Sequence, residues 1–254
     1  MPAPVNTFKH GLAEGRLQIG LWSQIGSANA VEMVAGAGFD FIGIDGEHGP
    51  SDLVTILHQL QACAAGGATH PMVRIPEADP VLVKRYLDIG VQTLVFPQVE
   101  TAEQAAEIVS WTRYPPQGVR GFCGAPRASG YGRIKDYAAT AATEIAIVVQ
   151  PETMRALENI EQIAAVPGID ALFFGPGDLS ADMGHLAGAS RPEVIETLLA
   201  AGARVRRAGK SAGIICTDEA TTRRYIAAGF DIVAVGSDQG VLVSGCARLA
   251  RLYR

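Results

Sequence analysis

The stretch Ala35-Gly-Ala-Gly-Phe-Asp-Phe-Ile-Gly-Ile-Asp45 places small residues and glycines directly before a run of apolar residues. Glycine is common just past the last turn of a helix, and a short apolar run bounded by such signals indicates a buried strand. The same order returns as Ala-Ala-Gly-Phe-Asp at 227–231, ahead of the apolar run 232–235. We therefore interpret the chain as repeating units in which a helix ends at glycine and a strand follows.

Eight short apolar runs fit the strand position of this unit, and each precedes a stretch with helical character. The runs are 18–22, 41–45, 71–74, 93–96, 145–150, 171–174, 212–216 and 232–235. The helices are expected near 28–35, 52–64, 80–88, 102–112, 154–164, 192–207, 219–228 and 239–252. Eight such units in 254 residues, with strands apolar throughout, are typical of a parallel barrel. We predict an α/β fold, a single (β/α)8 TIM barrel domain over residues 1–254.

An open doubly wound sheet is the alternative for this order of elements. That fold carries a Gly-x-Gly-x-x-Gly turn after its first strand, and the segment Gly20-Leu-Trp-Ser-Gln-Ile-Gly26 does not match it. Two long intervals, 97–144 and 175–211, must hold insertions. Because no linker-like segment marks a second domain, the barrel is the favoured interpretation.

The composition excludes several classes of protein. Hydrophobic residues make up 48% of the chain, and 21 Lys and Arg against 26 Asp and Glu give a net charge of −5. This charge provides no basic face for nucleic acid or an anionic membrane, and no apolar stretch is long enough to span a bilayer. The start of the chain lacks the apolar core of a signal peptide, so we expect a cytoplasmic protein. Four widely spaced cysteines suggest neither a disulfide framework nor a zinc site, and we expect them to be buried.

Active residues of such barrels lie at the carboxyl ends of the strands, and two predicted strand ends carry carboxylates. Glu152 and Asp178 follow neighbouring strands, so both can face one point on the barrel axis and bind Mg²⁺, Mn²⁺ or Co²⁺. The alternative is that each carboxylate only stabilises the amino end of a helix through the helix dipole. Gln150 can orient this site or hold a metal-bound water, or it can be a structural hydrogen-bonding residue.

Two further strand ends carry groups suited to proton transfer and anion binding. Asp45 precedes His48 by three residues, close enough for its carboxylate to fix the imidazole tautomer. Arg74 is the only basic residue that ends a predicted strand; it can bind an anionic substrate, or form a salt bridge to Glu47 or Asp45. Of the other histidines, His58 is expected in a helix, and the remainder in loops, namely His10, His70 and His185.

A glycine-rich turn and the absence of strand lysines complete the pattern. Gly175-Pro-Gly-Asp-Leu-Ser180 offers backbone N–H groups at Gly177 and Asp178 that can hold a carboxylate or phosphate. All four lysines fall outside the predicted strands, which argues against Schiff-base chemistry. Trp22 ends the first strand and is a candidate for substrate contact.

In these segments the chain resembles the HpcH/HpaI aldolase family of metal-dependent class II pyruvate aldolases. The segments that carry the resemblance are Gln18-Ile-Gly-Leu-Trp22, Ala35 to Asp40, Ile44-Asp-Gly-Glu-His48, Val73-Arg74, Arg113-Tyr-Pro-Pro-x-Gly-Val-Arg-Gly121, Gln150-x-Glu152, Gly175-Pro-x-Asp-Leu-Ser-Ala-Asp-Met-Gly184 and Ala234-Val-Gly236. The chain departs from the family at Pro151, where an aliphatic residue is common, and at Gly177, where Ala, Thr or Asn is common. Gly177 is expected to leave more room beneath a bound keto acid.

The resemblance implies a reversible aldol cleavage of 4-hydroxy-2-oxo acids to pyruvate and an aldehyde, with oxaloacetate decarboxylation as a side activity. It implies Glu152 and Asp178 as metal ligands, Arg74 on the substrate oxygens, and His48 with Asp45 in proton transfer. It also implies a homohexamer, a trimer of dimers, in which Asp88 supports a site near a subunit contact, and a role in aromatic catabolism.

Two alternative functions remain open. One is a lyase acting on a CoA thioester, like the citrate lyase β-subunit, although no basic groove for CoA is evident. The other is a barrel that binds a phosphate ligand through Gly213 and Gly236-Ser237, after its last two strands. The segment 114–136 follows a helix. If its residues Arg120, Phe122 or Arg127 contact substrate, contact in the active site of a neighbouring subunit is at least as plausible as contact in the site of the same subunit.

Overall fold

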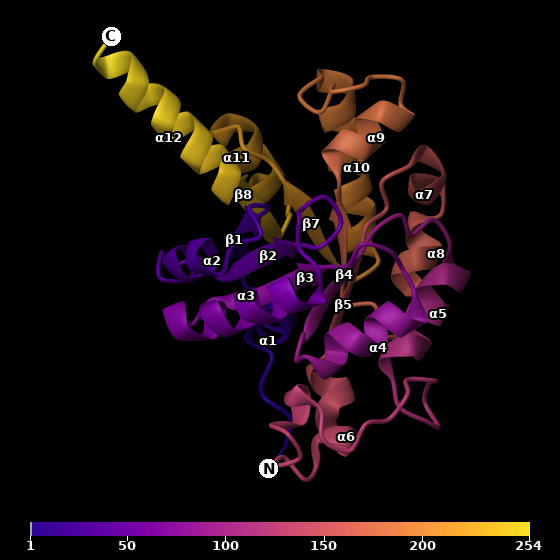
Figure 1. Ribbon diagram of the computed structural model, residues 1–254. Coiled ribbons are helices and arrows are strands. Elements are labelled where there is room, and N and C mark those ends of the chain that lie inside the picture. The colour runs from indigo at the N-terminus through magenta and orange to yellow at the C-terminus, as the bar shows by residue number, and fades with distance from the viewer. Residues whose placement is uncertain (1) are drawn as a thin grey trace.

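Eight parallel strands form a closed barrel in the order β1 to β8, with helices around it (Figure 1). This computed structural model describes residues 2–254. The strands are β1 (Gln18–Ser23), β2 (Phe41–Asp45), β3 (His70–Arg74), β4 (Thr93–Phe96), β5 (Ala146–Val149), β6 (Ala171–Phe174), β7 (Ser211–Ile215) and β8 (Ile232–Ser237). The predicted (β/α)8 fold is confirmed, and β2, β4 and β6 have the predicted bounds.

The repeated Gly-Phe-Asp motif sets the start of the strands. Gly38 and Gly229 have φ angles of 92° and 94°, which glycine adopts without the steric cost of a side chain. The aspartates that follow, Asp40 and Asp231, each accept a hydrogen bond from a backbone N–H of the preceding strand, β1 and β7 respectively. Asp170 does the same for β5. In this motif the glycine therefore ends a helix, and the aspartate joins the amino end of the next strand to the preceding strand.

The helices surround this barrel, and several follow the predicted bounds. They are α1 (Thr7–Ala13), α2 (Ala28–Ala35), α3 (Leu53–Gly66), α4 (Pro80–Asp88), α5 (Ala102–Thr112), α6 (Tyr137–Thr140), α7 (Met154–Glu158), α8 (Ile160–Ala165), α9 (Pro176–Asp182), α10 (Pro192–Arg207), α11 (Glu219–Ala227) and α12 (Asp238–Leu252), with short 3₁₀ turns at Arg127–Ser129 and Ala141–Glu144. The predicted helix 154–164 is two helices, because the chain leaves helical geometry at Asn159, whose side chain donates to the Glu100 carbonyl.

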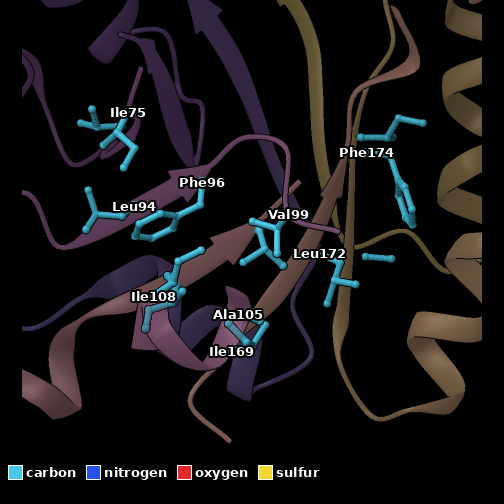
Figure 2. Close-up of a cluster of buried hydrophobic side chains, with 14 of the residues drawn as sticks. Ile75, Leu94, Phe96, Val99, Ala105, Ile108, Ile169, Leu172 and Phe174 are labelled. Carbon is cyan, nitrogen blue, oxygen red and sulfur yellow. The ribbon is translucent and has the colours of Figure 1, made fainter. Parts of the chain in front are cut away.

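Two apolar layers hold the barrel together. The outer layer lies between strands and helices, as Figure 2 shows for Leu94, Phe96 and Leu172 against Ala105 and Ile108 of α5. The inner layer fills the barrel with side chains that include Trp22, Phe41, Met72 and Phe173. Close packing on both faces explains why the strands read as continuous apolar runs.

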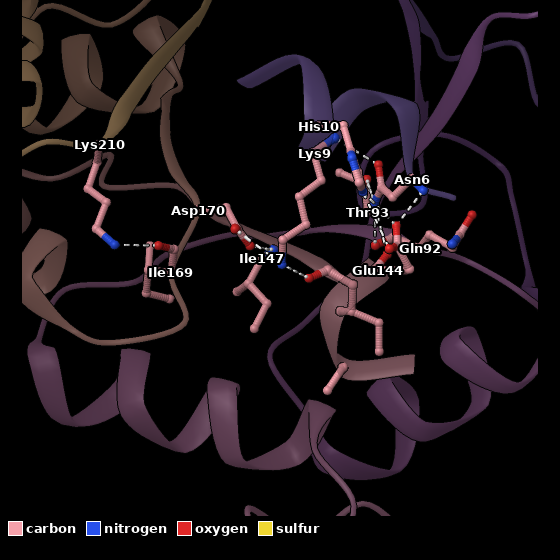
Figure 3. Close-up of polar contacts among 12 residues, drawn as sticks. Asn6, Lys9, His10, Gln92, Thr93, Glu144, Ile147, Ile169, Asp170 and Lys210 are labelled. Carbon is pink, nitrogen blue, oxygen red and sulfur yellow. Dashed lines mark hydrogen bonds and ion pairs between the residues drawn. The ribbon is translucent and has the colours of Figure 1, made fainter. Parts of the chain in front are cut away.

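The short helix α1 closes the amino end of the barrel. Phe8 is fully buried there, in contact with the rings of Phe41 and His70. The Asn6 amide donates to the Gln92 and Glu144 carbonyls and to the Thr93 hydroxyl (Figure 3). The expectation that His10 and His70 lie in loops is wrong, because His10 lies in α1 and His70 begins β3, where it contacts the Thr93 hydroxyl.

The last helix, α12, projects away from the barrel (Figure 1). Its only buried residue is Asp238, whereas Val241, Leu242 and Val243 are more than half exposed.

The expectation of buried cysteines holds for Cys63 alone, since Cys216 is partly exposed, and Cys123 and Cys246 are exposed outside the packed core. Within residues 2–254 no helix has the length and apolar character to cross a membrane, and the expected cytoplasmic location stays a prediction.

Candidate active site

Polar side chains gather at the carboxyl end of the barrel, as expected from the sequence. They come from the ends of β2, β3, β5 and β6, and the buried ones are Asp45, Arg74, Gln150 and Glu152. Asp178 lies in the first turn of α9, directly after β6, and is exposed to solvent. These residues form two groups, one around Arg74 and one around Glu152.

Arg74 is held by two carboxylates. Its Nε and Nη2 donate to Oδ1 and Oδ2 of Asp45 at 3.1 and 2.7 Å, and its Nη1 pairs with Glu47 at 3.0 Å. The register of β2 and β3 places Asp45 directly beside Arg74, which is why residues far apart in sequence meet. Because a guanidinium has five N–H groups, one hydrogen on each of Nη1 and Nη2 remains outside these contacts.

Both carboxylates have shifted pKa values. Burial acts to raise the pKa of Asp45, but the hydrogen bonds and the charge of Arg74 outweigh it and hold the pKa at about 2. Burial raises the pKa of Glu47, against the opposing charge of Arg74. Asp45 is therefore negatively charged at neutral pH and pairs with Arg74. The salt bridge that was the alternative role for Arg74 is present in the structure.

His48 lies at the edge of this group, with 60% of its side chain exposed. Asp45 accepts the backbone N–H of His48, while the carboxylate beside the imidazole is Glu47, 3.8 Å from Nε2. The expectation that Asp45 fixes the imidazole tautomer therefore differs from the structure, because the Asp45 oxygens face Arg74. Asp45, three residues before His48, contacts the backbone of His48 and not its imidazole ring.

Trp22 lies beneath Arg74 and is 3% exposed. Its indole Nε1 donates to Asp45 at 3.2 Å, and the guanidinium lies 5.3 Å from the ring centroid. The structure therefore places Trp22 as a support for Arg74 and Asp45. Gln24, which sequence reasoning missed, also donates to Asp45, at 3.0 Å; its position two residues beyond the predicted strand was the only available signal.

The second group converges above Gly175. A Cβ atom at this position would lie 2.6 Å from Glu152 Oε2, 3.6 Å from Gln150 Nε2 and 3.7 Å from Asp178 Oδ2. The missing side chain thus leaves room for these three residues to approach one another. Sequence reasoning paired Glu152 with Asp178, and the structure brings them together.

Glu152 is a buried acid with half of its carboxylate unpaired. Oε1 accepts the backbone N–H of Gln98 at 2.8 Å, whereas Oε2 has no hydrogen-bond partner in the described part of the chain. Burial raises the pKa of Glu152 to about 7; the Gln98 hydrogen bond opposes this, and the charges of Asp178 and Glu47 add to it. Gln98 has a φ of 54°, a strained conformation for this residue type, and sequence reasoning assigned it no role.

These residues fit a hard divalent cation. Among residues 2–254, Glu152 Oε2 and Gln150 Oε1 are buried oxygens without hydrogen-bond partners, and Asp178 adds a second carboxylate. No cluster of three or more His, Cys, Asp or Glu suited to a metal exists in residues 2–254. A cation held by two carboxylates keeps coordination positions for water and substrate, as Mg²⁺ does in many enzymes.

Gly177 borders open space beside the second group. Apart from its chain neighbours and its own helix backbone, no described heavy atom lies within 4 Å of a Cβ built on Gly177, and the residue lines a cavity of about 240 Å³ together with Cys216, Thr217 and Asp218. A second cavity, of about 340 Å³, lies beside Glu47 and Gln98. Each cavity includes a residue next to the second group, since Gly177 precedes Asp178 and the backbone of Gln98 donates to Glu152.

Asp88 does not join the site of its own chain. It ends α4 at the amino end of the barrel, where its carboxylate accepts a 2.8 Å hydrogen bond from the buried Arg120. Arg120 also lies over the Tyr114 ring, and Phe122 is exposed. The segment 114–136 therefore starts on the face opposite to the site.

Gly213 and Ser237, two of the residues named for a phosphate site, have structural roles. Gly213 lies inside β7, where a Cβ would meet the Phe173 ring at 2.4 Å, and the Ser237 hydroxyl accepts a backbone N–H at the start of α12. The alternative of a phosphate-binding barrel is therefore not supported by these residues.

Comparison with known proteins identifies the family. The HpcH/HpaI aldolase/citrate lyase family model matches residues 18–245. The chain is 48% identical to a hydroxypyruvate/pyruvate aldolase of Roseovarius nubinhibens, over 94% of this chain and 93% of that protein. It is 47% identical to a 4-hydroxy-2-oxovalerate aldolase of Rhodococcus jostii, over 100% and 98% of the two chains.

Solved structures agree with this result. A family member from Burkholderia cenocepacia superposes with a TM-score of 0.95 at 39% identity, over 98% of this chain and 100% of that one. A citrate lyase of Burkholderia xenovorans and the CitE protein of Mycobacterium tuberculosis share 19% and 18% identity, at TM-scores of 0.59 and 0.57, and so resemble the chain in fold alone. The chain belongs to the HpcH/HpaI aldolase/citrate lyase family.

Proposed function

We propose that the protein is a class II pyruvate aldolase, which reversibly cleaves 4-hydroxy-2-oxo acids into pyruvate and an aldehyde. The observation that carries this proposal is the meeting of Glu152, Asp178 and Gln150 beside a buried Arg74 at the carboxyl end of the barrel. The aldolases at 47 to 48% identity support the same reaction class.

The proposed mechanism assigns separate tasks to the two groups of residues. Glu152 and Asp178 would hold a divalent cation, with Gln150 beside it, and such a cation would supply Lewis-acid polarisation of the C2 carbonyl of the keto acid. Arg74 donates its remaining N–H groups to the oxygen that becomes negative in the pyruvate enolate. The backbone N–H groups of Gly177 and Asp178 bind the substrate carboxylate.

His48 acts as the general base in the cleavage direction. It accepts the proton of the C4 hydroxyl, directly or through a water molecule, while the C3–C4 bond breaks and the aldehyde leaves. The electron pair of the broken bond forms the enolate, and protonation at C3 gives pyruvate. With oxaloacetate, loss of CO₂ gives the same enolate, which accounts for the proposed side activity.

Metal dependence is the first test. Chelation is expected to abolish aldol activity, and Mg²⁺, Mn²⁺ or Co²⁺ to restore it, with the most effective ion indicating the native metal. Borohydride added with pyruvate is expected to leave the enzyme active, since no lysine of residues 2–254 lies at the carboxyl end of a strand. Covalent trapping of pyruvate on a lysine would contradict the class II mechanism.

The aldehyde is the second test. Purified, metal-loaded enzyme with pyruvate is to be screened against neutral, hydroxylated and carboxylated aldehydes, with acetyl-CoA as the probe for the thioester alternative. Condensation with one or more aldehydes and none with acetyl-CoA is expected. The preferred aldehyde will decide whether the proposed role in aromatic catabolism holds.

We further propose a homohexamer, a trimer of dimers, in which α12 packs against a second copy of the chain. The exposed Val241, Leu242 and Val243 support association, and in their own barrel Ile19 and Val235 remain only partly buried where an eighth helix would cover β1 and β8. Asp88, held by Arg120, would then support a neighbouring site. Light scattering after size exclusion is expected to give six times the mass of 26.6 kDa; Leu242→Lys is expected to lower it.

A further inference from the structure

The turn after β1 is anchored by a residue from the other end of the sequence. Asp238, the first residue of α12 and 6% exposed, accepts the Ser23 hydroxyl at 2.9 Å. It also accepts the backbone N–H groups of Gln24, Ile25 and Gln239, at 2.9, 3.3 and 2.7 Å. Both carboxylate oxygens are thus used to fix the backbone on either side of Gln24.

The fixed turn aims the Gln24 side chain at Asp45. Gln24 Nε2 donates to Asp45 Oδ2 at 3.0 Å, and the same oxygen accepts Arg74 Nη2 at 2.7 Å and Trp22 Nε1 at 3.2 Å. The other oxygen, Oδ1, accepts Arg74 Nε and the backbone N–H groups of Glu47 and His48. Six donors therefore determine the plane of the Asp45 carboxylate.

The plane of Asp45 in turn determines the plane of Arg74. Two parallel hydrogen bonds between a carboxylate and a guanidinium fix the position and the tilt of the guanidinium. The hydrogens of Arg74 that remain for the substrate then point in one direction only. Loss of a donor on Oδ2 leaves Asp45 freer to rotate, and Arg74 rotates with it.

We propose that Gln24 and Asp238 are positioning residues for Arg74: Asp238 fixes the turn after β1, the turn aims Gln24 at Asp45, and Asp45 orients the guanidinium. This inference rests on the proposed function for its catalytic consequence. Its structural part, the restraint on Arg74, stands independently and is measured separately below.

Gln24→Leu tests the proposal, with Gln239→Leu as the matched control on the other side of Asp238. Metal-loaded enzyme and pyruvate in D₂O are expected to exchange the methyl protons of pyruvate, because enolate formation needs no aldehyde. Loss of a hydrogen bond to a charged group is expected to lower the maximal exchange rate of Gln24→Leu about tenfold. Metal affinity by calorimetry is expected to stay unchanged, and Gln239→Leu to behave as wild type.

The double variant separates positioning from a general structural role. If Gln24 acts through Arg74, adding Gln24→Leu to Arg74→Ala is expected to cause no further loss of exchange. If the double variant instead shows the product of the losses of exchange rate in the two single variants, the proposal is overturned. Asp238→Asn is expected to act like Gln24→Leu; if it does not fold, Ser23→Ala, which removes one of the contacts to Asp238, is expected to show a smaller loss in the same direction.

A chemical readout is independent of activity. Phenylglyoxal modifies arginine side chains, and the rate at Arg74 can be followed by peptide mass spectrometry. Gln24→Leu is expected to speed modification of Arg74 several-fold, and Gln239→Leu to leave it unchanged. An inactive wild type in which Gln24→Leu still frees Arg74 would overturn the proposed aldolase and keep the restraint; an active wild type with no change at Arg74 would overturn the positioning role alone.

Discussion

The two ends of the barrel use the same residue types in opposite ways. At the amino end, Glu144 contacts His10 and the backbone of Asn6, and Lys9 pairs with Asp170 (Figure 3). At the carboxyl end, Glu152 is buried, and one of its oxygens has no hydrogen-bond partner among the residues that the structure describes. A buried polar atom without a partner costs free energy, whereas a paired one contributes to stability. The paired contacts at the amino end therefore serve folding, whereas the unpaired Glu152 oxygen is the one that we propose for ligand binding.

The largest expected effect is at Glu152. Glu152→Gln keeps the shape of the side chain but removes the charge that a divalent cation needs, so metal affinity is expected to fall by more than the 10- to about 100-fold cost of losing a supporting contact. Isothermal titration with Mn²⁺ measures this. Glu144→Gln is the matched control at the other end, expected to bind metal normally; equal affinity in Glu152→Gln would remove Glu152 as a ligand.

Arg74 is expected to give the next largest effect. Arg74→Ala removes a donor to the developing enolate oxygen, at a cost on the order of 3 kcal/mol, or about a hundredfold in rate. The methyl signal of pyruvate in D₂O reports it. Arg74→Lys is expected to recover little, because an ammonium does not reproduce the planar fork. Near-normal exchange in Arg74→Ala would leave Arg74 as a purely structural partner of Asp45 and Glu47.

At the amino end, His70 is expected to affect stability through pH. Burial lowers its pKa from 6.5 to about 4, so between these values the unfolded chain binds a proton that the folded chain does not. Stability therefore falls as pH decreases from 6.5 towards 4, by about 2 kcal/mol at pH 5 relative to pH 8. Urea unfolding at a series of pH values checks this. The slope is expected to be reduced in His70→Gln and kept in His58→Gln, an exposed control.

Lys9 is expected to show the smallest effect. Its Nζ donates to the Ile145 carbonyl at 2.7 Å and pairs with Asp170 at 3.3 Å, both partly exposed to solvent (Figure 3). Lys9→Met is expected to lower the free energy of unfolding by about 1 kcal/mol and to leave pyruvate exchange unchanged. A loss of exchange in this variant would show that the two ends of the barrel are not independent.

The barrel could be predicted because the unit of helix, glycine and strand repeats along the sequence. Contacts between side chains of different strands do not follow such a repeat. The Gly-Phe-Asp motif before β2 and β8 marked the boundaries of helix and strand. The sequence offered Asp45 two partners, His48 by proximity and Arg74 as a salt bridge, and the parallel register places Asp45 beside Arg74. The role of Gln24 had no such signal, because it depends on contacts between strands that are distant in sequence.

Short elements were missed for a related reason. Helix α1 has only seven residues, and Phe8 and Gly11 are its buried ones, so no helical period can be read from it. The break between α7 and α8 depends on the hydrogen bond from Asn159 to Glu100, a contact across 59 residues. Local patterns predict elements, while tertiary contacts decide where they end.

Helix α1 also places a constraint on the order of folding during synthesis. Its anchor, Asn6, bonds to the backbone of Glu144, 138 residues later in the chain. Ribosomes add about 5–20 residues per second, so α1 emerges on the order of ten seconds before Glu144 exists. Through that interval Phe8 has no completed barrel to enter, and the first helix to be synthesised is among the last to reach its native position.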